Sequence, residues 1–240
     1  MLGMQRALSL IYPAQCQMCP AQVAEAGGLC PDCWRETPFL QGLTCDTCGL
    51  PLPGSDTGSV LCDDCLAAPR NWEAGRAALA YRDMGRKIVL ALKHGDRLDL
   101  AEPAAGWMLR AGQGFLSPGV LLVPVPVHWS RLLARRYNQS VELARALARQ
   151  SGLEVCPDAL IRTRRTRTQD GLTRAARQAN LEGAIRANPR RCDLIRGRSL
   201  CLIDDVMTSG ATMEAASEAA RRAGADHVFV LLLARVEKSA

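Results

Sequence analysis

The segment SLCLIDDVMTSGAT, residues 199–212, joins a short apolar run to two adjacent carboxylates and a loop rich in hydroxyl side chains. An unbroken apolar run is typical of a strand that is buried on both faces, as in a parallel α/β sheet. Ligands of such sheets bind beyond the carboxyl ends of the strands, so Asp204 and Asp205 are expected at a ligand site. An alanine-rich helix is predicted to begin directly after the loop.

The loop after the two acids has the composition of a phosphate-binding turn. It opens a predicted helix, whose first backbone N–H groups can bind an anion, and Gly210 lets that backbone approach a ligand closely. The hydroxyls of Thr208, Ser209 and Thr212 can donate further hydrogen bonds. Carboxylates repel a bare phosphate, so the combination favours a sugar phosphate whose ribose hydroxyls donate to the acids. The alternative is an acidic strand end followed by an ordinary helix cap.

Residues 203–212, IDDVMTSGAT, resemble the phosphoribosyl pyrophosphate (PRPP) motif of type I phosphoribosyltransferases, which usually have Thr where this chain has Ser209. Neither a P-loop nor a dinucleotide-binding glycine motif is found in the sequence. The resemblance implies that Asp204 and Asp205 hold the ribose hydroxyls and are the catalytic acids. It also implies that the 5′-phosphate is held by Thr208, Ser209, Gly210, Ala211 and Thr212.

Charge is distributed unevenly over the 240 residues, whose formal net charge is +6. Residues 121–200 carry 16 Arg against 6 Asp and Glu, and the rest of the chain is net acidic. A basic central segment favours an anionic ligand such as pyrophosphate or nucleic acid. The alternative is an arginine-rich face that is simply solvated.

Eight of the 11 cysteines form four Cys-x-x-Cys pairs between residues 16 and 65, a pattern that indicates metal binding rather than disulfides. Such short segments lack a core, and sites made of four thiolates leave no open position, so two structural zinc ions are expected. Redox or catalytic use is the alternative, and interleaved pairing is compatible with the spacing. We expect one zinc at Cys16, Cys19, Cys30 and Cys33 and another at Cys45, Cys48, Cys62 and Cys65.

The length suffices for one ordinary domain and a small one, predicted as a double zinc ribbon over residues 1–70 and an α/β domain over 71–240. Strands are expected at 77–81, 120–123, 159–161, 199–203 and 227–234, and helices at 1–13, 85–94, 98–109, 140–150 and 211–223. The sequence has neither a transmembrane run nor the pattern of a signal peptide. We therefore expect no membrane insertion. Cysteines that bind metal must stay reduced, which favours a cytoplasmic protein.

Two further segments are assigned by resemblance to phosphoribosyltransferases. The predicted strand 120–123 ends in Pro124-Val125-Pro126-Val127-His128, whose prolines favour a rigid loop at the same sheet edge as the acids. By this resemblance, Val125, Pro126, Val127 and His128 bind pyrophosphate. An arginine-rich stretch that closes over a diphosphate is expected at Arg164, Arg165, Arg167, Thr168 and Gln169.

The order of motifs resembles the ComF family, which pairs cysteine-rich zinc ribbons with a phosphoribosyltransferase-like domain and is associated with natural DNA uptake. The matching segments are residues 135–139, 164–172 and 177–180. Members of the family usually have Gly-Phe where this chain has Arg136-Tyr137. The expected fold is therefore a type I phosphoribosyltransferase-like, mostly parallel sheet flanked by helices, with a zinc-ribbon module before it.

Two functions follow from these expectations. In the first, the protein binds PRPP with Mg²⁺, which is held chiefly by substrate oxygens and water, and transfers phosphoribose to an unknown acceptor. Arginines of the 164–167 segment neutralise the charge of the leaving pyrophosphate. The alternative is a non-enzymatic DNA-uptake factor that binds single-stranded DNA or competence proteins and uses the PRPP pocket as a ligand sensor. An aromatic content of 4% counts against base stacking in that alternative.

Overall fold

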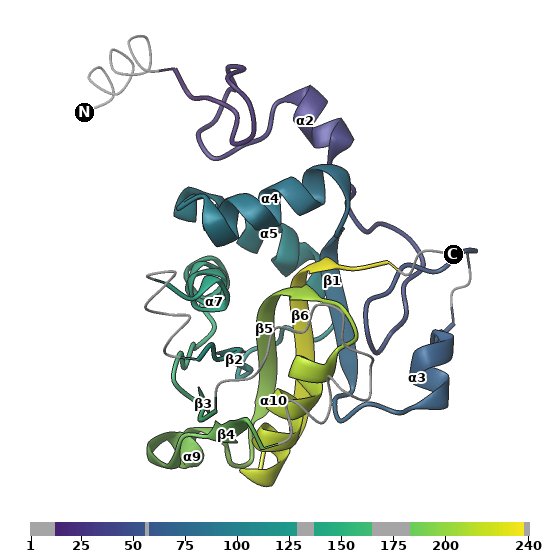
Figure 1. Cartoon of the computed structure of the whole chain (residues 1–240), viewed down its shortest axis with the longest axis vertical. Helices are drawn as coiled ribbons and strands as arrows, with labels where there is room; N and C mark the ends of the chain where they lie inside the picture. The colour runs from purple at the N-terminus through teal and green to yellow at the C-terminus, as the bar shows by residue number, and fades with distance from the viewer. Residues whose placement is uncertain (1–12, 56–57, 129–136, 165–182, 238–240) are drawn as a thin grey trace.

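A computed structural model describes residues 13–55, 58–128, 137–164 and 183–237 of the protein (Figure 1). Its centre is a four-stranded sheet in the order β1-β6-β5-β2, in which every pair of neighbours is parallel. The strands are β1 (Ala74–Ala80), β6 (His227–Arg235), β5 (Ser199–Met207) and β2 (Leu121–Pro124). The strand that carries the two acids therefore lies inside the sheet, and the expected mostly parallel α/β fold is confirmed.

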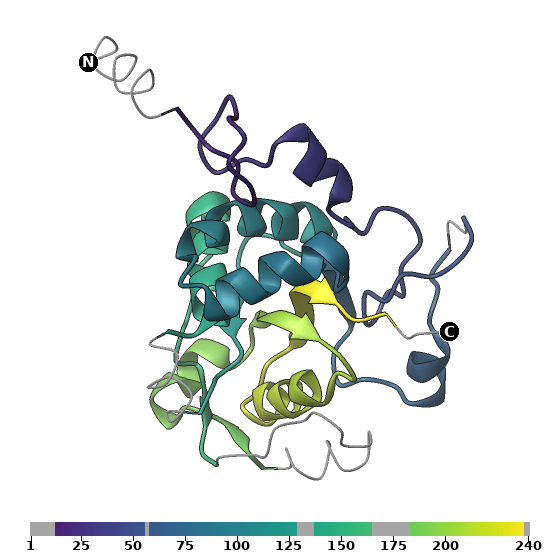
Figure 2. The same ribbon diagram turned by 45° about the horizontal axis from the view of Figure 1, so that its top comes forward.

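Helices cover both faces of this sheet (Figure 2). Because successive side chains of a strand point to opposite faces, Cys201 and Ile203 of β5 pack in one core and Leu200 and Leu202 in the other. Among the described helices of 12 or more residues, three contribute side chains to the first core and one contributes to the second. The three are α4 (Asp83–His94), α5 (Ala101–Gly112) and α7 (Gln139–Ser151), and the one is α10 (Ala211–Arg222).

Strand β5 extends further than its apolar run predicts. Val206 and Met207 still pair with Ala234 and Arg235 of β6, so both acids lie within the last part of the strand rather than after it. Strand β1 likewise begins at Ala74 rather than residue 77, because its first residues pair with β6. The segment expected as a helix over 98–109 is divided into a 3₁₀ turn, η1 (Leu98–Leu100), and α5.

Short elements complete the described chain. The zinc-ribbon module contains α2 (Pro31–Glu36) and α3 (Asp63–Ala67). A separate antiparallel pair is formed by β3 (Leu160–Arg162) and β4 (Ile185–Ala187), and η2 (Pro189–Arg191) and α9 (Cys192–Ile195) follow it. The helix expected within residues 1–13 lies outside the described residues except for Pro13. In the part of the chain that the structure describes, we find no helix with the length and apolarity needed to cross a membrane.

The two cysteine clusters pack against opposite faces of the sheet. Three cysteines of the first cluster belong to the core that contains α4, α5 and α7, and all four of the second belong to the core that contains α10. The second ribbon approaches β1 at backbone distance, since a Cβ atom built on Gly75 would lie 2.4 Å from the carbonyl oxygen of Thr47. In Figure 1 the chain accordingly places α2 beside α4, and α3 on the far side of β1.

Candidate functional site

The two acids of β5 are held by side chains from two helices. The Ser140 hydroxyl, in the first turn of α7, donates a hydrogen bond of 2.7 Å to Oδ1 of Asp204, and the backbone N–H of Asp205 donates one of 2.9 Å to the same oxygen. Lys93 in the last turn of α4 places its Nζ 2.8 Å from Oδ2 of Asp205. Both carboxylates are therefore oriented by the protein itself.

Burial, together with the neighbouring charge of Asp205, raises the pKa of Asp204 to about 7. The hydrogen bond from Ser140 and the charge of Lys93 oppose this rise without cancelling it. Asp204 as a residue is only half-buried, but its carboxyl group is packed among protein atoms, and the carboxyl group carries the charge. Near neutral pH this side chain can therefore exchange a proton, as either an acceptor or a donor of hydrogen bonds.

A pocket joins Asp204 to the hydroxyl-rich loop and the beginning of α10. Gly210 occupies the N-cap position of this helix with φ of +85°, a left-handed conformation that favours glycine. The hydroxyl of Ser209 is buried and has no hydrogen-bond partner among the described residues. A buried hydroxyl in this condition is a polar group that a bound oxyanion would satisfy. The pocket is lined by Asp204, Val206, Met207, Thr208, Gly210, Ala211, Thr212 and Met213.

The loop expected to bind pyrophosphate follows β2, the strand next to β5. Its first residue, Val125, donates its backbone N–H to the carbonyl of Ile203 over 2.9 Å, so the ladder continues one residue beyond Pro124. The Asn138 side chain donates a 3.0 Å hydrogen bond to the Val125 carbonyl. Pro126 and His128 are buried and Val127 is half-buried. The structure thus places this loop at the sheet edge beside the acids.

Three residues that connect the acids of β5, the loop after β2 and the neighbouring helices were not predicted as site residues. A lysine in the last turn of a helix, as Lys93 is in α4, commonly interacts with the helix dipole, but here it pairs with Asp205. Asn138 caps α7 by accepting from the backbone N–H of Ser140 at 3.1 Å while it holds Val125. Tyr137 donates its hydroxyl to the Leu92 carbonyl over 2.8 Å. The Asn before a predicted helix is a cap signal that could have been recognised, whereas the ion pair depends on packing.

The arginine segment is described only in part. Arg164 is exposed just after β3. The other residues expected there, Arg165, Arg167, Thr168 and Gln169, lie outside the described residues, as does Arg136. A contact between this segment and the pocket therefore stays a prediction.

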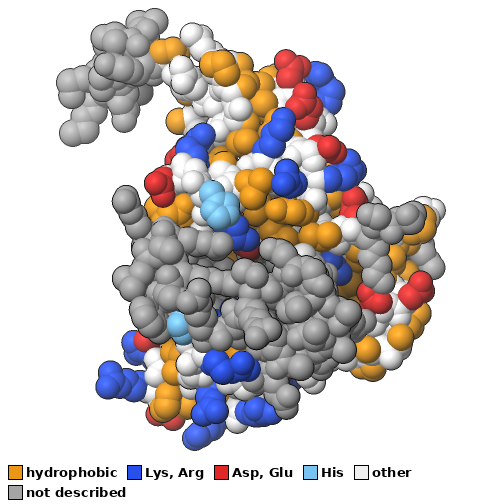
Figure 3. Space-filling view, viewed as in Figure 1, with side chains coloured by type: hydrophobic (Ala, Val, Ile, Leu, Met, Phe, Trp, Pro, Cys, Tyr) orange, Lys and Arg blue, Asp and Glu red, His pale blue; other side chains and the backbone are white. Residues whose placement is uncertain are grey.

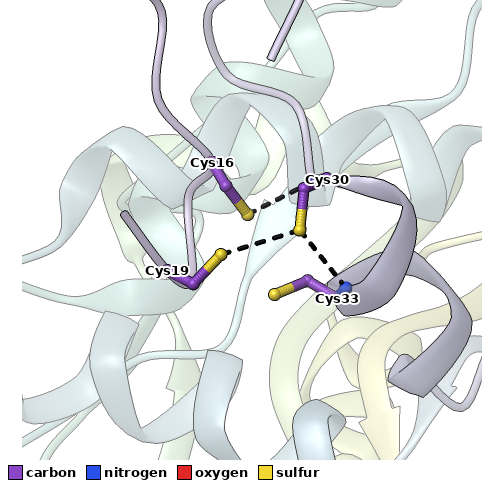
Figure 4. A group of neighbouring side chains, drawn as sticks. All are labelled: Cys16, Cys19, Cys30 and Cys33. Atoms are coloured by element: carbon purple, nitrogen blue, oxygen red, sulfur yellow. Dashed lines mark hydrogen bonds between the residues drawn. The ribbon is translucent and has the colours of Figure 1, made fainter. Parts of the chain in front are cut away.

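The cysteines form two separate four-sulfur clusters. In each cluster the ligand atoms lie within 4.8 Å of one another, and the Sγ atoms of Cys19 and Cys30, like those of Cys48 and Cys62, are 3.6 Å apart. Zinc–sulfur bonds of about 2.3 Å in a tetrahedron require sulfur separations of about 3.8 Å, so both clusters fit the metal. Figure 4 shows the sulfurs of the first cluster converging. Sequential pairing is thus confirmed, and the interleaved alternative is wrong.

Backbone N–H groups also point at the first cluster. The N–H of Met18 donates to Sγ of Cys16 over 3.4 Å. The N–H of Cys30 donates to the same sulfur over 3.2 Å, and that of Cys33 donates to Sγ of Cys30 over 3.5 Å (Figure 4). In the second cluster, the hydrogen bond from Cys48 lowers the pKa of Cys45 to about 4, and the same bond raises the pKa of Cys48. Thiolates rather than thiols are the form that binds metal, so the N–H donors at the first cluster and the lowered pKa of Cys45 favour zinc. Each site is closed by four protein ligands, as expected for structural zinc.

Comparison with known protein families supports the zinc ribbons, and comparison with solved structures gives weaker similarity over about 60% of the chain. Residues 7–66 match the family described as a double zinc ribbon domain. Among solved structures, the allosteric regulatory enzyme of purine biosynthesis is similar over 60% of this chain and 30% of that chain, with 21% identity and a TM-score of 0.40. A hypoxanthine phosphoribosyl transferase of Trypanosoma cruzi is similar over 63% and 66%, with 14% identity and a TM-score of 0.34. Because these scores are low, the site is assigned from its own residues.

Relatives of nearly the same length identify the family. The chain is 30% identical over 233 residues to the DNA utilization protein YhgH of Escherichia coli K12, covering 94% of this chain and 99% of that protein. The YhgH protein of Salmonella typhi is 31% identical over 234 residues, with the same coverage. Competence protein F of Haemophilus influenzae is 32% identical over 114 residues, covering 48% of this chain and 49% of that protein. The chain therefore belongs to the ComF family of DNA utilization and competence proteins.

Proposed function

We propose that this protein binds PRPP with Mg²⁺ in the pocket between β5 and α10 and transfers its phosphoribosyl group to a nucleophilic acceptor. One observation carries the proposal: a single pocket is lined by Asp204, by the hydroxyl residues Thr208 and Thr212 and by Gly210 at the beginning of α10. The neighbouring Ser209, outside that lining, has a buried hydroxyl without a described partner. Binding of an oxyanion would satisfy this hydroxyl, and an adjacent carboxylate favours a sugar on that anion over a bare phosphate.

Each part of the ligand has a matching group. The first backbone N–H groups of α10 and the hydroxyls of residues 208–212 bind the 5′-phosphate, helped by the positive end of the helix dipole. Asp204, which lines the pocket, accepts from the ribose. The pyrophosphate lies along Val125–His128 at the neighbouring strand. Mg²⁺ is held mainly by oxygens of the ligand and by water, since Asp205 is already paired with Lys93.

The reaction breaks the bond between the anomeric carbon and the pyrophosphate oxygen, and the acceptor forms the new bond to that carbon. Positive charge develops on the ribose ring in the transition state. A carboxylate fixed by Ser140 beside the ring stabilises this charge without reorganising. Mg²⁺ bound to the ligand supplies charge neutralisation for the pyrophosphate that leaves.

The test is calorimetric titration of the zinc-loaded full chain with PRPP and Mg²⁺, using Asp204→Asn and Asp205→Asn. We expect either substitution to weaken binding at least about tenfold, equivalent to about 1.4 kcal/mol. Asp99→Asn is the control, because Asp99 pairs with Arg97 at the surface, 2.8 Å from it. Unchanged affinity in both variants of the acid pair, or no binding by the native protein, would refute the proposal.

A second candidate function, binding of single-stranded DNA, is favoured by one surface feature and by the names of the relatives. Lys and Arg side chains gather over β4 and α9 in Figure 3. Among the exposed residues there are Arg186, Arg190 and Arg196. Fluorescence anisotropy of a labelled single-stranded oligonucleotide would test this function over a range of salt concentrations. A linear log–log salt dependence that Arg186→Gln/Arg190→Gln/Arg196→Gln reduces and Asp204→Asn leaves unchanged would support it. No binding at moderate salt would exclude it.

A further inference from the structure

Arg235, the last residue of β6, lies between the second cysteine cluster and the phosphate-binding loop. Its side chain is buried, with 4% exposure. On one side, Nη1 donates to the carbonyls of Met207 at 3.0 Å and Thr208 at 2.6 Å, where β5 passes into the loop. On the other side, Nε donates to the carbonyl of Cys48 over 3.2 Å, and Nη2 lies 3.9 Å from Sγ of the same residue.

The guanidinium of Arg235 is a buried positive charge, and the second cysteine cluster is close enough to stabilise it. A buried cation is costly unless an opposite charge lies near it. The described partners of Arg235 are neutral carbonyls and the sulfur of Cys48. A zinc site with four thiolates has a net charge of about −2, because the four negative charges outweigh the two positive charges of Zn²⁺. The loaded second site is therefore the nearby anion that stabilises the guanidinium in this position.

A second connection between ribbon and loop runs through Trp72 and Arg70. The indole N–H of Trp72 donates to the carbonyl of Thr47, inside the second ribbon, over 2.6 Å. A Cβ built on Gly210 would lie 3.6 Å from the Trp72 ring and 3.4 Å from Nη1 of Arg70. The guanidinium of Arg70 in turn lies 5.5 Å from the centre of that ring. The loop thus rests on residues that the second ribbon holds.

We propose that the second zinc site fixes the phosphate-binding loop through Arg235, so that zinc at this site controls the affinity of the pocket. The first zinc site packs in the core on the opposite face of the sheet and does not share this role. Loss of zinc from the second site removes the charge that holds Arg235 and releases the Cys48 carbonyl. The loop then loses the donor to its Thr208 carbonyl, and the end of β5 loses one of the two donors to the Met207 carbonyl, the other being the backbone N–H of Val236. The identity of the ligand in this inference rests on the proposed function, whereas the coupling of ribbon to loop does not.

Hydrogen–deuterium exchange of the ligand-free protein tests the coupling directly. Cys62→Ser removes a ligand of the second site, and Cys30→Ser, the matched control, removes one of the first; zinc content is measured for both. Amides of residues 207–212 should exchange about tenfold faster in Cys62→Ser than in the native protein and at the native rate in Cys30→Ser. Equal exchange in the two variants would overturn the proposal.

Arg235 variants keep the test decisive where Cys62→Ser does not fold. Arg235→Gln should retain two zinc ions per chain, exchange faster at residues 207–212, and bind PRPP with Mg²⁺ about tenfold more weakly. Arg235→Lys, which retains the charge and a donor, should recover part of both losses. A zinc-loaded Arg235→Gln protein with native exchange and native affinity would refute the role. If the native protein does not bind PRPP, the exchange result still decides the coupling, and only the proposed ligand fails.

Discussion

The hydroxyl of Ser140 lies 2.7 Å from Oδ1 of Asp204, although the two residues are 64 positions apart in the chain. Ser140 stands in the first turn of α7, two residues after Asn138, which caps that helix and holds the loop after β2. One short segment therefore orients an acid of β5 and positions the neighbouring loop. The candidate site is thus formed, without a ligand, by the sheet, by α7 on one of its faces and by α10 on the other.

The raised pKa of Asp204 predicts a pH dependence of stability. The folded protein keeps this proton up to about pH 7, whereas an unfolded chain releases it near pH 4. Between these values the folded state binds more protons, so the free energy of unfolding falls as pH rises and levels off above pH 7. Asp204→Asn removes this loss. The variant should gain about 1–3 kcal/mol over the native protein at pH 8 and little at pH 4.

Urea unfolding at several pH values measures this difference, with Asp99→Asn as the control. Arg97 lowers the pKa of Asp99, so the contribution of Asp99 is lost only as pH falls below its unfolded value. The difference between Asp99→Asn and the native protein should therefore be constant from about pH 5 to pH 8. Parallel curves for Asp204→Asn and the native protein would contradict the raised pKa.

Removing Lys93 should destabilise the protein because it leaves a buried carboxylate without its partner. Asp205 is 6% exposed, and Lys93 is its ion-pair partner at 2.8 Å. Lys93→Met is expected to cost about 1–3 kcal/mol, less than a fully buried pair because the lysine is partly exposed. Lys87→Met, on the exposed face of the same helix, should change stability by less than about 0.5 kcal/mol. In a double-mutant cycle, Asp205→Asn should recover part of the loss; additive effects would disprove the pairing.

Two serines, one just before α10 and one within it, should respond differently to substitution by alanine. Ser209→Ala removes a buried hydroxyl that has no described partner, so the free energy of unfolding should stay constant or rise. Its affinity for PRPP should fall about tenfold. Ser217→Ala removes a 2.5 Å hydrogen bond to the carbonyl of Asn71 and should cost about 1 kcal/mol without changing affinity. Thermal unfolding and calorimetric titration measure both quantities, and a loss of stability in Ser209→Ala would show that its hydroxyl already has a partner.

Asn138 performs two tasks that substitutions can separate. Serine is a good N-cap residue but is too short to reach the Val125 carbonyl, whereas alanine can do neither. Asn138→Ala should cost about 1–2 kcal/mol of stability, and Asn138→Ser clearly less. Both should speed hydrogen exchange in residues 125–128, as mass spectrometry of that peptide would show. Native exchange in Asn138→Ser would indicate that the loop is held by other contacts.

Local patterns predicted the elements that form the site. The apolar run of β5, the hydroxyl-rich loop and α10 are adjacent in sequence, and each cysteine pair is a local signal. The order of strand, loop and helix in residues 199–222 and the two clusters were therefore predicted correctly. The boundary of β5 was wrong by four residues because strand pairing, not hydrophobicity, carries it to Met207. Strand β4 was missed because three residues of mixed burial have no recognisable period.

The contacts that orient the site were beyond the reach of local patterns. Arg235 and Cys48 are 187 positions apart, and their contact exists only because β6 ends where the second ribbon packs. Lys93 likewise meets Asp205 because α4 ends at the edge of the sheet where β5 ends. A sequence without aligned relatives shows that such charged residues exist but does not say which of them meet.

The absence of a side chain at position 75 has a consequence for engineering. With the carbonyl of Thr47 only 2.4 Å from where a Cβ would stand, even alanine would force the second ribbon off β1. A foreign ribbon grafted onto this sheet would need the same backbone path across that glycine to dock at all. The ribbon and the first strand are therefore best exchanged between relatives as one cassette, spanning residues 45–80, rather than divided at a linker.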